Sequence, residues 1–216
     1  MINSVMKQEG EEMKQEKEQA VNEHAGIGMN GHILIRDKET GEELVNKRNA
    51  IHYGNMANMV ANALNNQSQS YIHFMAFGNG GTSVDTAGKV VYKSPRVSES
   101  FEASADLYSR SYNKVISAAA SDPTTDKIEV VAGSSFTDLK VTCTLGYAEP
   151  SDQDLFDSST DNDASYVFDE LALFSYPTDG SNITTSKMLT HVIFHPVQKS
   201  QNRIIEIIYT VRIQLS

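Results

Sequence analysis

Carboxylates crowd one segment of this chain, where they could in principle bind a cation. Between Tyr147 and Ser165 there are six acidic residues and no lysine or arginine; they are Glu149, Asp152, Asp154, Asp157, Asp161 and Asp163. Hard cations such as Ca²⁺ prefer several carboxylate oxygens, but the glycine and the terminal glutamate of an EF-hand are missing here. We therefore expect a solvated loop or a contact with another chain, with Asp152, Asp154 and Asp157 as candidate assembly residues.

A glycine-rich turn, Gly78-Asn-Gly-Gly81, directly follows an apolar segment, as phosphate-binding loops do. It lacks the Gly-Lys-Ser/Thr ending of a P-loop, and no helical pattern follows that could direct a dipole at an anion. A nucleotide site is therefore not expected. Gly78, Gly80 and Gly81 are instead predicted to serve turn geometry, with left-handed or unrestricted backbone angles.

The other reactive side chains lack suitable partners. His191 and His195 lie four apart in a strand-like segment, on one face but well separated, and no third residue has the spacing of a zinc ligand. The single cysteine, Cys143, shares a strand face with Val141 and Leu145, which predicts a buried structural thiol. No Gly-x-Ser-x-Gly elbow is present. The sequence therefore predicts no catalytic, cofactor-binding or metal site, and no enzyme.

Composition narrows the class of protein further. The 216 residues suffice for one or two domains with a real core, and 39% hydrophobic with 21% charged residues is typical of globular proteins. The net charge of −10 argues against a general nucleic-acid binder, which needs basic residues for the phosphates, although an acidic surface could line a DNA conduit. No apolar run approaches the length of a membrane span, and no secretion signal begins the chain. We expect a cytoplasmically made protein without a membrane partner or small-molecule substrate.

The N-terminal part differs from the rest. Residues 1–25 are rich in Glu, Gln and Lys, which predicts either a solvated or disordered arm or an arm that orders on a neighbouring subunit. Glycines 26, 28 and 31 then form a flexible junction. The expected division is an arm and linker over 1–30 and a β-domain over 31–216.

Two local patterns follow the junction. His32–Arg36 and Glu43–Val45 flank a polar turn in which Gly41 can take a positive φ, which predicts a hairpin. Asn49 is expected to cap a helix over Ile51–Asn65. The apolar stripe of this helix has helical spacing and consists of Tyr53, Met56, Met59, Val60, Ala63 and Leu64, and its opposite side is rich in asparagine.

The remainder has the alternation of β-strands, most clearly at its end. Strands are expected over Ile72–Phe77, Tyr108–Ser117, Lys127–Ala132, Asp138–Tyr147, Tyr166–Phe174, Met188–Val197 and Ile204–Leu215. The pattern predicts a mainly β fold, an antiparallel β-sandwich with one amphipathic helix and an N-terminal charged arm. Two long connections, 78–107 and 147–165, are expected to be functional or ordered by a partner.

Three motifs together resemble tailed-bacteriophage virion structural proteins of the tail, neck and baseplate, a β-sandwich family. The matching residues are Asn49, Ile51 and Asn62-Ala-Leu64, then Phe77-Gly-Asn-Gly-Gly-Thr82, then Glu170-Leu-Ala-Leu-Phe174. The resemblance spans roughly residues 45–215. The Ser/Asp-rich insert near 150–163 and the charged arm depart from the family pattern.

This resemblance implies a non-enzymatic structural subunit located in the virion. It would assemble with copies of itself and with neighbouring virion proteins into a ring or collar at the neck (the head-to-tail connection), tail or baseplate. The assembly regions would be the arm 1–25, the loop 78–107 and the acidic loop 149–163, with Glu170 among the assembly residues. The alternative is a receptor- or glycan-binding module of a tail fibre assembly, which would need exposed aromatic residues on a concave face.

Overall fold

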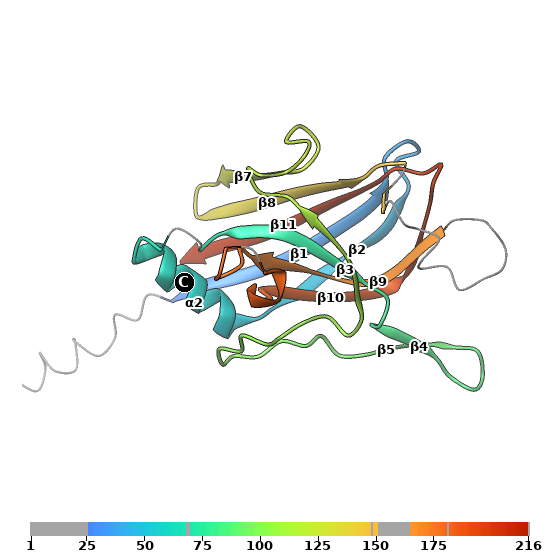
Figure 1. Ribbon diagram of the computed structural model, residues 1–216, viewed down its shortest axis with the longest axis horizontal. Helices are drawn as coiled ribbons and strands as arrows, with labels where there is room; N and C mark the ends of the chain where they lie inside the picture. Colours follow the sequence, from blue (N-terminus) through green and yellow to red (C-terminus); the bar gives the residue numbers. More distant parts are fainter. Residues whose placement is uncertain (1–25, 68–69, 148, 151–164, 181, 216) are drawn as a thin grey trace, which may run out of the picture.

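A nine-stranded antiparallel sheet dominates the computed structural model, which describes residues 26–67, 70–147, 149–150, 165–180 and 182–215 (Figure 1). The strand order is β6-β3-β9-β10-β2-β1-β11-β8-β7, and a separate two-stranded sheet pairs β4 with β5. The strands are β1 (Ile27–Asp37), β2 (Glu43–Ile51), β3 (Ile72–Gly78), β4 (Thr82–Val84), β5 (Val90–Tyr92), β6 (Arg110–Val115), β7 (Lys127–Ala132), β8 (Phe136–Leu145), β9 (Ser165–Ser175), β10 (Thr190–Ser200) and β11 (Ile205–Leu215). The helices are α2 (Tyr53–Leu64) and the short 3-10 helix η2 (Ile183–Thr185). The predicted mainly β, antiparallel fold with one amphipathic helix is confirmed.

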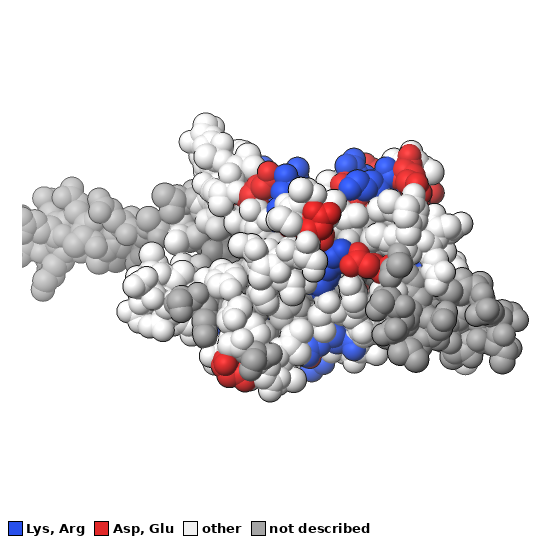
Figure 2. Space-filling model, turned by 45° about the horizontal axis from the view of Figure 1, so that its top comes forward, with Lys and Arg blue, Asp and Glu red and all other residues white. Residues whose placement is uncertain are grey.

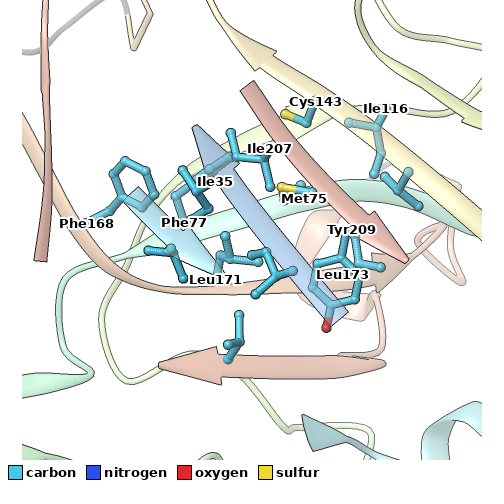
Figure 3. Close-up of a cluster of buried hydrophobic side chains, with 14 of the residues drawn as sticks. Ile35, Met75, Phe77, Ile116, Cys143, Phe168, Leu171, Leu173, Ile207 and Tyr209 are labelled. Atoms are coloured by element: carbon cyan, nitrogen blue, oxygen red, sulfur yellow. The ribbon is translucent and has the colours of Figure 1, made fainter. Parts of the chain in front are cut away.

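The sheet curls so that its two halves face one another across the core. Buried side chains from β3 and β9 meet those from β8 and β11, as Figure 3 shows for Met75, Phe77, Cys143, Ile207 and Tyr209. The predicted burial of Cys143 is confirmed, because none of its surface is exposed. A sheet with one continuous apolar face lowers its free energy by folding that face against itself.

The last strand follows the alternation of its sequence. Along β11, Ile205, Ile207, Tyr209 and Val211 are all buried, and Glu206 and Arg212 alternate with them. β11 pairs with β1 from Ile27–Leu215 to Asp37–Ile205 and with β8 on its other side. Since β1 begins at Ile27, four residues that the sequence assigned to the linker belong to the sheet. The arm expected over 1–25 lies outside the described residues.

The helix begins later than expected. Asn49 does not cap it, because β2 continues to Ile51 and pairs there with Thr190 of β10. The cap is His52, whose Nδ1 accepts the backbone N–H of Asn55 at 3.3 Å. The predicted hairpin is present, with Gly41 at a φ of 76° in its turn. Among the described residues, no helix has the length and apolar character that a membrane span requires.

A polar cluster links the two edges of the curled sheet. Lys114 of β6 lies with its Nζ 3.1 Å from Asp126 Oδ2, just before β7, and also contacts Glu149 and the Thr144 carbonyl at the end of β8. Asp126 is buried and accepts the Thr144 N–H at 2.7 Å. The Lys114 cluster thereby holds the β6 edge against the β7–β8 edge at one end of the core.

Candidate functional site

Two adjacent carboxylates of β9 hold the glycine turn. Asp169 accepts the Gly81 N–H at 2.9 Å and the Thr82 N–H at 2.7 Å, and it also contacts the Thr82 hydroxyl. Glu170 accepts the Gly80 N–H at 3.1 Å. The two motifs that the sequence singled out, about ninety residues apart, therefore meet at one place, and the backbone donors of the turn bind the chain's own anions.

Glu170 also holds the far end of the long connection. Its Oε1 accepts the Ser109 N–H at 2.8 Å and its Oε2 accepts the Tyr108 N–H at 3.0 Å. His191 of β10 lies beside it, with Nε2 3.0 Å from Glu170 Oε2. Burial raises the pKa of the Glu170 carboxyl, but the hydrogen bonds from His191 and the three backbone N–H groups outweigh burial and hold the pKa below its ordinary value.

His191 fixes the middle of the same connection. Its Nδ1 accepts the backbone N–H of Arg96 at 2.8 Å, so the ring proton sits on Nε2 and is donated to Glu170. Asn55 adds a fourth attachment, because its amide accepts the Glu102 N–H at 2.9 Å and donates to the Glu102 carbonyl at 2.8 Å. We call these four side chains, Asp169, Glu170, His191 and Asn55, the anchor. Asp169 is 3% exposed and the other three are fully buried.

The glycines of the turn allow other parts of the chain to approach its backbone closely. None of Gly78, Gly80 and Gly81 has a positive φ, so the left-handed geometry predicted for them is wrong. A Cβ at Gly78 would lie 2.4 Å from the Ser109 carbonyl oxygen, and one at Gly81 would lie 2.9 Å from a methyl group of Ile193. The turn needs glycine because other backbone and side-chain atoms approach it closely.

The anchored connection, residues 79–109, presents a hairpin whose apolar side chains are exposed. β4 and β5 project from the body of the protein (Figure 1). Val84 is 68% exposed, Val91 45% and Tyr92 49%. At the hairpin's base, Lys93 Nζ donates to the Gly80 carbonyl at 2.6 Å and the Tyr92 hydroxyl lies 3.2 Å from His195 Nδ1. The connection is therefore ordered by its own chain, and it presents exposed apolar side chains on both faces of the hairpin, Val84 and Tyr92 on one face and Val91 on the other.

The arrangement offers little for catalysis. Each anchor carboxylate is saturated by donors, and His191 uses both ring nitrogens within the fold. His195 is exposed and contacts Tyr92, so the two histidines have separate partners. Among the described residues, no three His, Cys, Asp or Glu side chains gather as metal ligands would. Burial raises the pKa of the Cys143 thiol, which disfavours the reactive thiolate.

Of the acidic loop 149–163, the structure describes only Glu149 and Pro150. Asp152, Asp154 and Asp157 lie outside the described residues. Glu149 is described, and its carboxylate accepts the Gly146 N–H at 2.9 Å and pairs with Lys114. Glu149 therefore belongs to the Lys114 cluster.

The sequence singled out Glu170 and the glycines, pointed to His191 only as a possible zinc ligand, and did not reveal the roles of Asp169 and Asn55. One signal was present in the sequence: Asp169 and Glu170 are consecutive acids inside an apolar strand, and buried carboxylates need hydrogen-bond donors. The glycine turn offered backbone N–H groups, but nothing in the spacing connected the two segments.

Compared with known proteins, the chain matches no family model, no curated protein and no solved structure. The resemblance to tailed-phage proteins gains no support from these comparisons, so function has to be inferred from the geometry and the motifs.

Proposed function

We propose that the chain is a non-enzymatic structural subunit of a tailed-phage virion, assembling with copies of itself into a ring or collar at the neck, tail or baseplate. The observation that carries this proposal is the anchored hairpin, which exposes Val84, Val91 and Tyr92 on a connection fixed by four buried side chains. The motif resemblance supplies the virion context.

The physical reason is that the hairpin would lose little conformational freedom when it binds. A loop that is already fixed loses little conformational entropy when it docks, so apolar burial contributes more fully to affinity. A projecting element that docks on a different surface of the next subunit makes a heterologous contact, which closes into a ring when the rotation from one subunit to the next divides a full turn. Ring formation through the β4–β5 hairpin is therefore the assembly mode that we propose.

The sheet edge formed by β7 offers a second contact to the same ring. Val130 is 71% and Val131 49% exposed on this strand, and its outer backbone groups face no other strand among the described residues. Exposed apolar edge strands tend to pair with other chains. The net charge of −10 would let such a ring surround DNA without binding it.

Light scattering of the purified chain, followed by negative-stain imaging, tests the assembly. The wild type should form rings or a defined oligomer that grows with concentration. At least one of Val84→Asp and Val91→Asp should shift the mass towards the monomer, because they place a charge on opposite faces of the hairpin and the buried contact uses at least one of these faces. Thr86→Asp is the matched control, since it adds the same charge to the hairpin's exposed turn.

The outcomes separate clearly. A wild type that stays monomeric at high concentration, or oligomers that Val84→Asp and Val91→Asp leave intact, would refute assembly through the hairpin. The virion location has its own test, which is mass spectrometry of purified particles produced from the genome that encodes the chain. Absence of the chain from those particles would refute it.

A further inference from the structure

Helix α2 itself carries no charged side chain, although Glu102 and Lys187 of other segments lie against it. No Asp, Glu, Lys or Arg occurs between Arg48 and Asp85, although helices on protein surfaces usually carry charged residues on their outer side. Figure 2 shows charged side chains over the upper, middle and lower parts of the visible face and few at its left-hand end, the side on which α2 lies in Figure 1. Amide side chains take the place of charges here, which indicates a surface suited to neutral polar ligands.

A pocket of about 450 Å³ opens at the end of α2, where the helix meets the segment after β9. Its lining is mostly neutral and polar and includes Asn62, Asn65, Gln67, Ser175, Tyr176 and Lys187. No carboxylate lies among the lining residues. The one cation, Lys187, already donates to Asn58 Oδ1 at 3.1 Å and lies over the Phe101 ring. The pocket therefore offers mainly amides and hydroxyls, with the single ammonium of Lys187 held by Asn58 and Phe101.

Aromatic rings border this pocket. The ring of Tyr176 lies 5.3 Å from that of Tyr71 and 4.8 Å from that of His73, measured between centroids. The Tyr176 hydroxyl donates to the Gly180 carbonyl at 3.1 Å, which fixes the ring, and Tyr71 is 40% exposed. A second groove, of about 870 Å³, includes Tyr71 and shares Met59 and Ser70 with the first pocket. The two hollows adjoin at Met59 and Ser70, and together we call them the trough: its first part is amide-rich, and its second part is mostly apolar. The second part is also lined by Asp126 and Lys127, which are paired with Lys114 and Glu129 respectively.

We propose that this trough binds a neutral oligosaccharide. An amide both donates and accepts hydrogen bonds, so it can pair with neighbouring hydroxyls of a sugar, whose other faces are apolar and pack on tyrosine rings. A polyanionic ligand would meet only two cations, Lys187 and Lys127, the second of which already pairs with Glu129, and a purely apolar ligand would leave the amides unpaired. Adjoining hollows of about 450 and 870 Å³ fit several linked sugar units better than one. This binding role goes beyond the proposed assembly and does not depend on it.

Isothermal titration calorimetry on the full chain tests the proposal, with maltohexaose, cellohexaose and chitohexaose as probes. These cover α- and β-linked glucose and N-acetylated sugars, and at least one should bind saturably. Asn65→Ala with Gln67→Ala should weaken binding at least tenfold, because two neutral hydrogen bonds are lost. Asn79→Ala with Gln198→Ala is the matched control, since both of these amides are exposed and lie outside the trough.

A second pair of variants examines the aromatic surface. Tyr176→Phe keeps the ring and should bind within about threefold of the wild type, whereas Tyr176→Leu should lose most affinity while its far-UV circular dichroism stays unchanged. The proposal is overturned if no probe binds, if the double amide variant binds as tightly as its control, or if the uncharged surface proves to bury itself in the oligomer. Protection of α2 from hydrogen exchange upon oligomerisation, without sugar, would reveal the last case.

Discussion

Glu170→Gln gives the sharpest test of the anchor. Glu170 is fully buried and accepts four hydrogen bonds, two at each carboxylate oxygen. Replacing either oxygen by an amide NH₂ leaves two buried donors without an acceptor: Gly80 and Ser109 on one side, or Tyr108 and His191 on the other. Each such donor costs about 1–3 kcal/mol, so the free energy of unfolding should fall by about 3 kcal/mol.

Two measurements follow this substitution. Urea unfolding monitored by circular dichroism gives the global stability, and hydrogen-exchange mass spectrometry reports on residues 79–109, where exchange should accelerate most. Glu129→Gln is the control, because it removes the same charge from an exposed pair with Lys127 on β7 and should change stability by less than about 0.5 kcal/mol. A Glu170→Gln protein as stable as this control, with unchanged exchange over 79–109, would refute the anchor.

The pH dependence supplies an independent check of the same site. The folded-state pKa of Glu170 lies below its ordinary value of 4.5, so its stabilisation is present above that value and is lost as the pH falls through the folded-state pKa. In the wild type, exchange over 79–109 should therefore accelerate as the solution becomes more acidic than the ordinary pKa, relative to the rest of the sheet. Glu170→Gln should lack this acid-dependent step.

Three further predictions concern other parts of the fold. Backbone N–H groups and Arg203 lower the pKa of Asp37 from 3.8 to about 2, so Asp37 stabilises the fold above pH 3.8 and this stabilisation disappears as the pH falls through 2. The free energy of unfolding of Asp37→Asn should be lower than that of the wild type by about 1–2 kcal/mol at pH 6 and should decline less between pH 4 and 2, as measured by urea titration. Gly78→Ala should destabilise by about 2 kcal/mol in the same assay because its Cβ would meet the Ser109 carbonyl, whereas Gly146→Ala, with 3.7 Å to its nearest contact, should change little. Cys143 should react with a thiol reagent only as fast as the protein unfolds, and rapid labelling of the native chain would contradict its burial.

The strands were the most predictable part of the fold, for a local reason. β7 has the bounds expected from the sequence, Lys127–Ala132, and β11 differs by one residue, because alternation of apolar and polar side chains depends on the strand's own residues. The helix start was not predictable in the same way. Asn49 is a good cap by type, but pairing of Ile51 with β10 extended the strand past it. The start of the helix was therefore set by the pairing of Ile51 with Thr190, which lies 139 residues further along the chain.

The anchor, too, depends on contacts between distant segments that the local sequence pattern does not reveal. The sequence drew attention to the glycine turn and to Glu170 separately, yet their union depends on β3 and β9 being neighbours in the sheet. His191 was weighed as a metal ligand, because spacing alone cannot reveal a carboxylate that arrives from another strand. The role of the glycines was predicted from backbone freedom, whereas close packing against Ser109 and Ile193 explains it. The acidic-loop aspartates remain a prediction.

The place of β11 in the sheet governs when the chain can fold during synthesis. β11 lies between β1 and β8, so one side of β1 stays without its partner until the ribosome has released residues 205–215. Pairing of segments so far apart in sequence is slow, and a chain waiting for it exposes unpaired apolar strands. A nascent chain stalled before residue 205 should therefore remain sensitive to protease and prone to aggregation. The sheet becomes stable only after β11, its last described strand, has entered between β1 and β8.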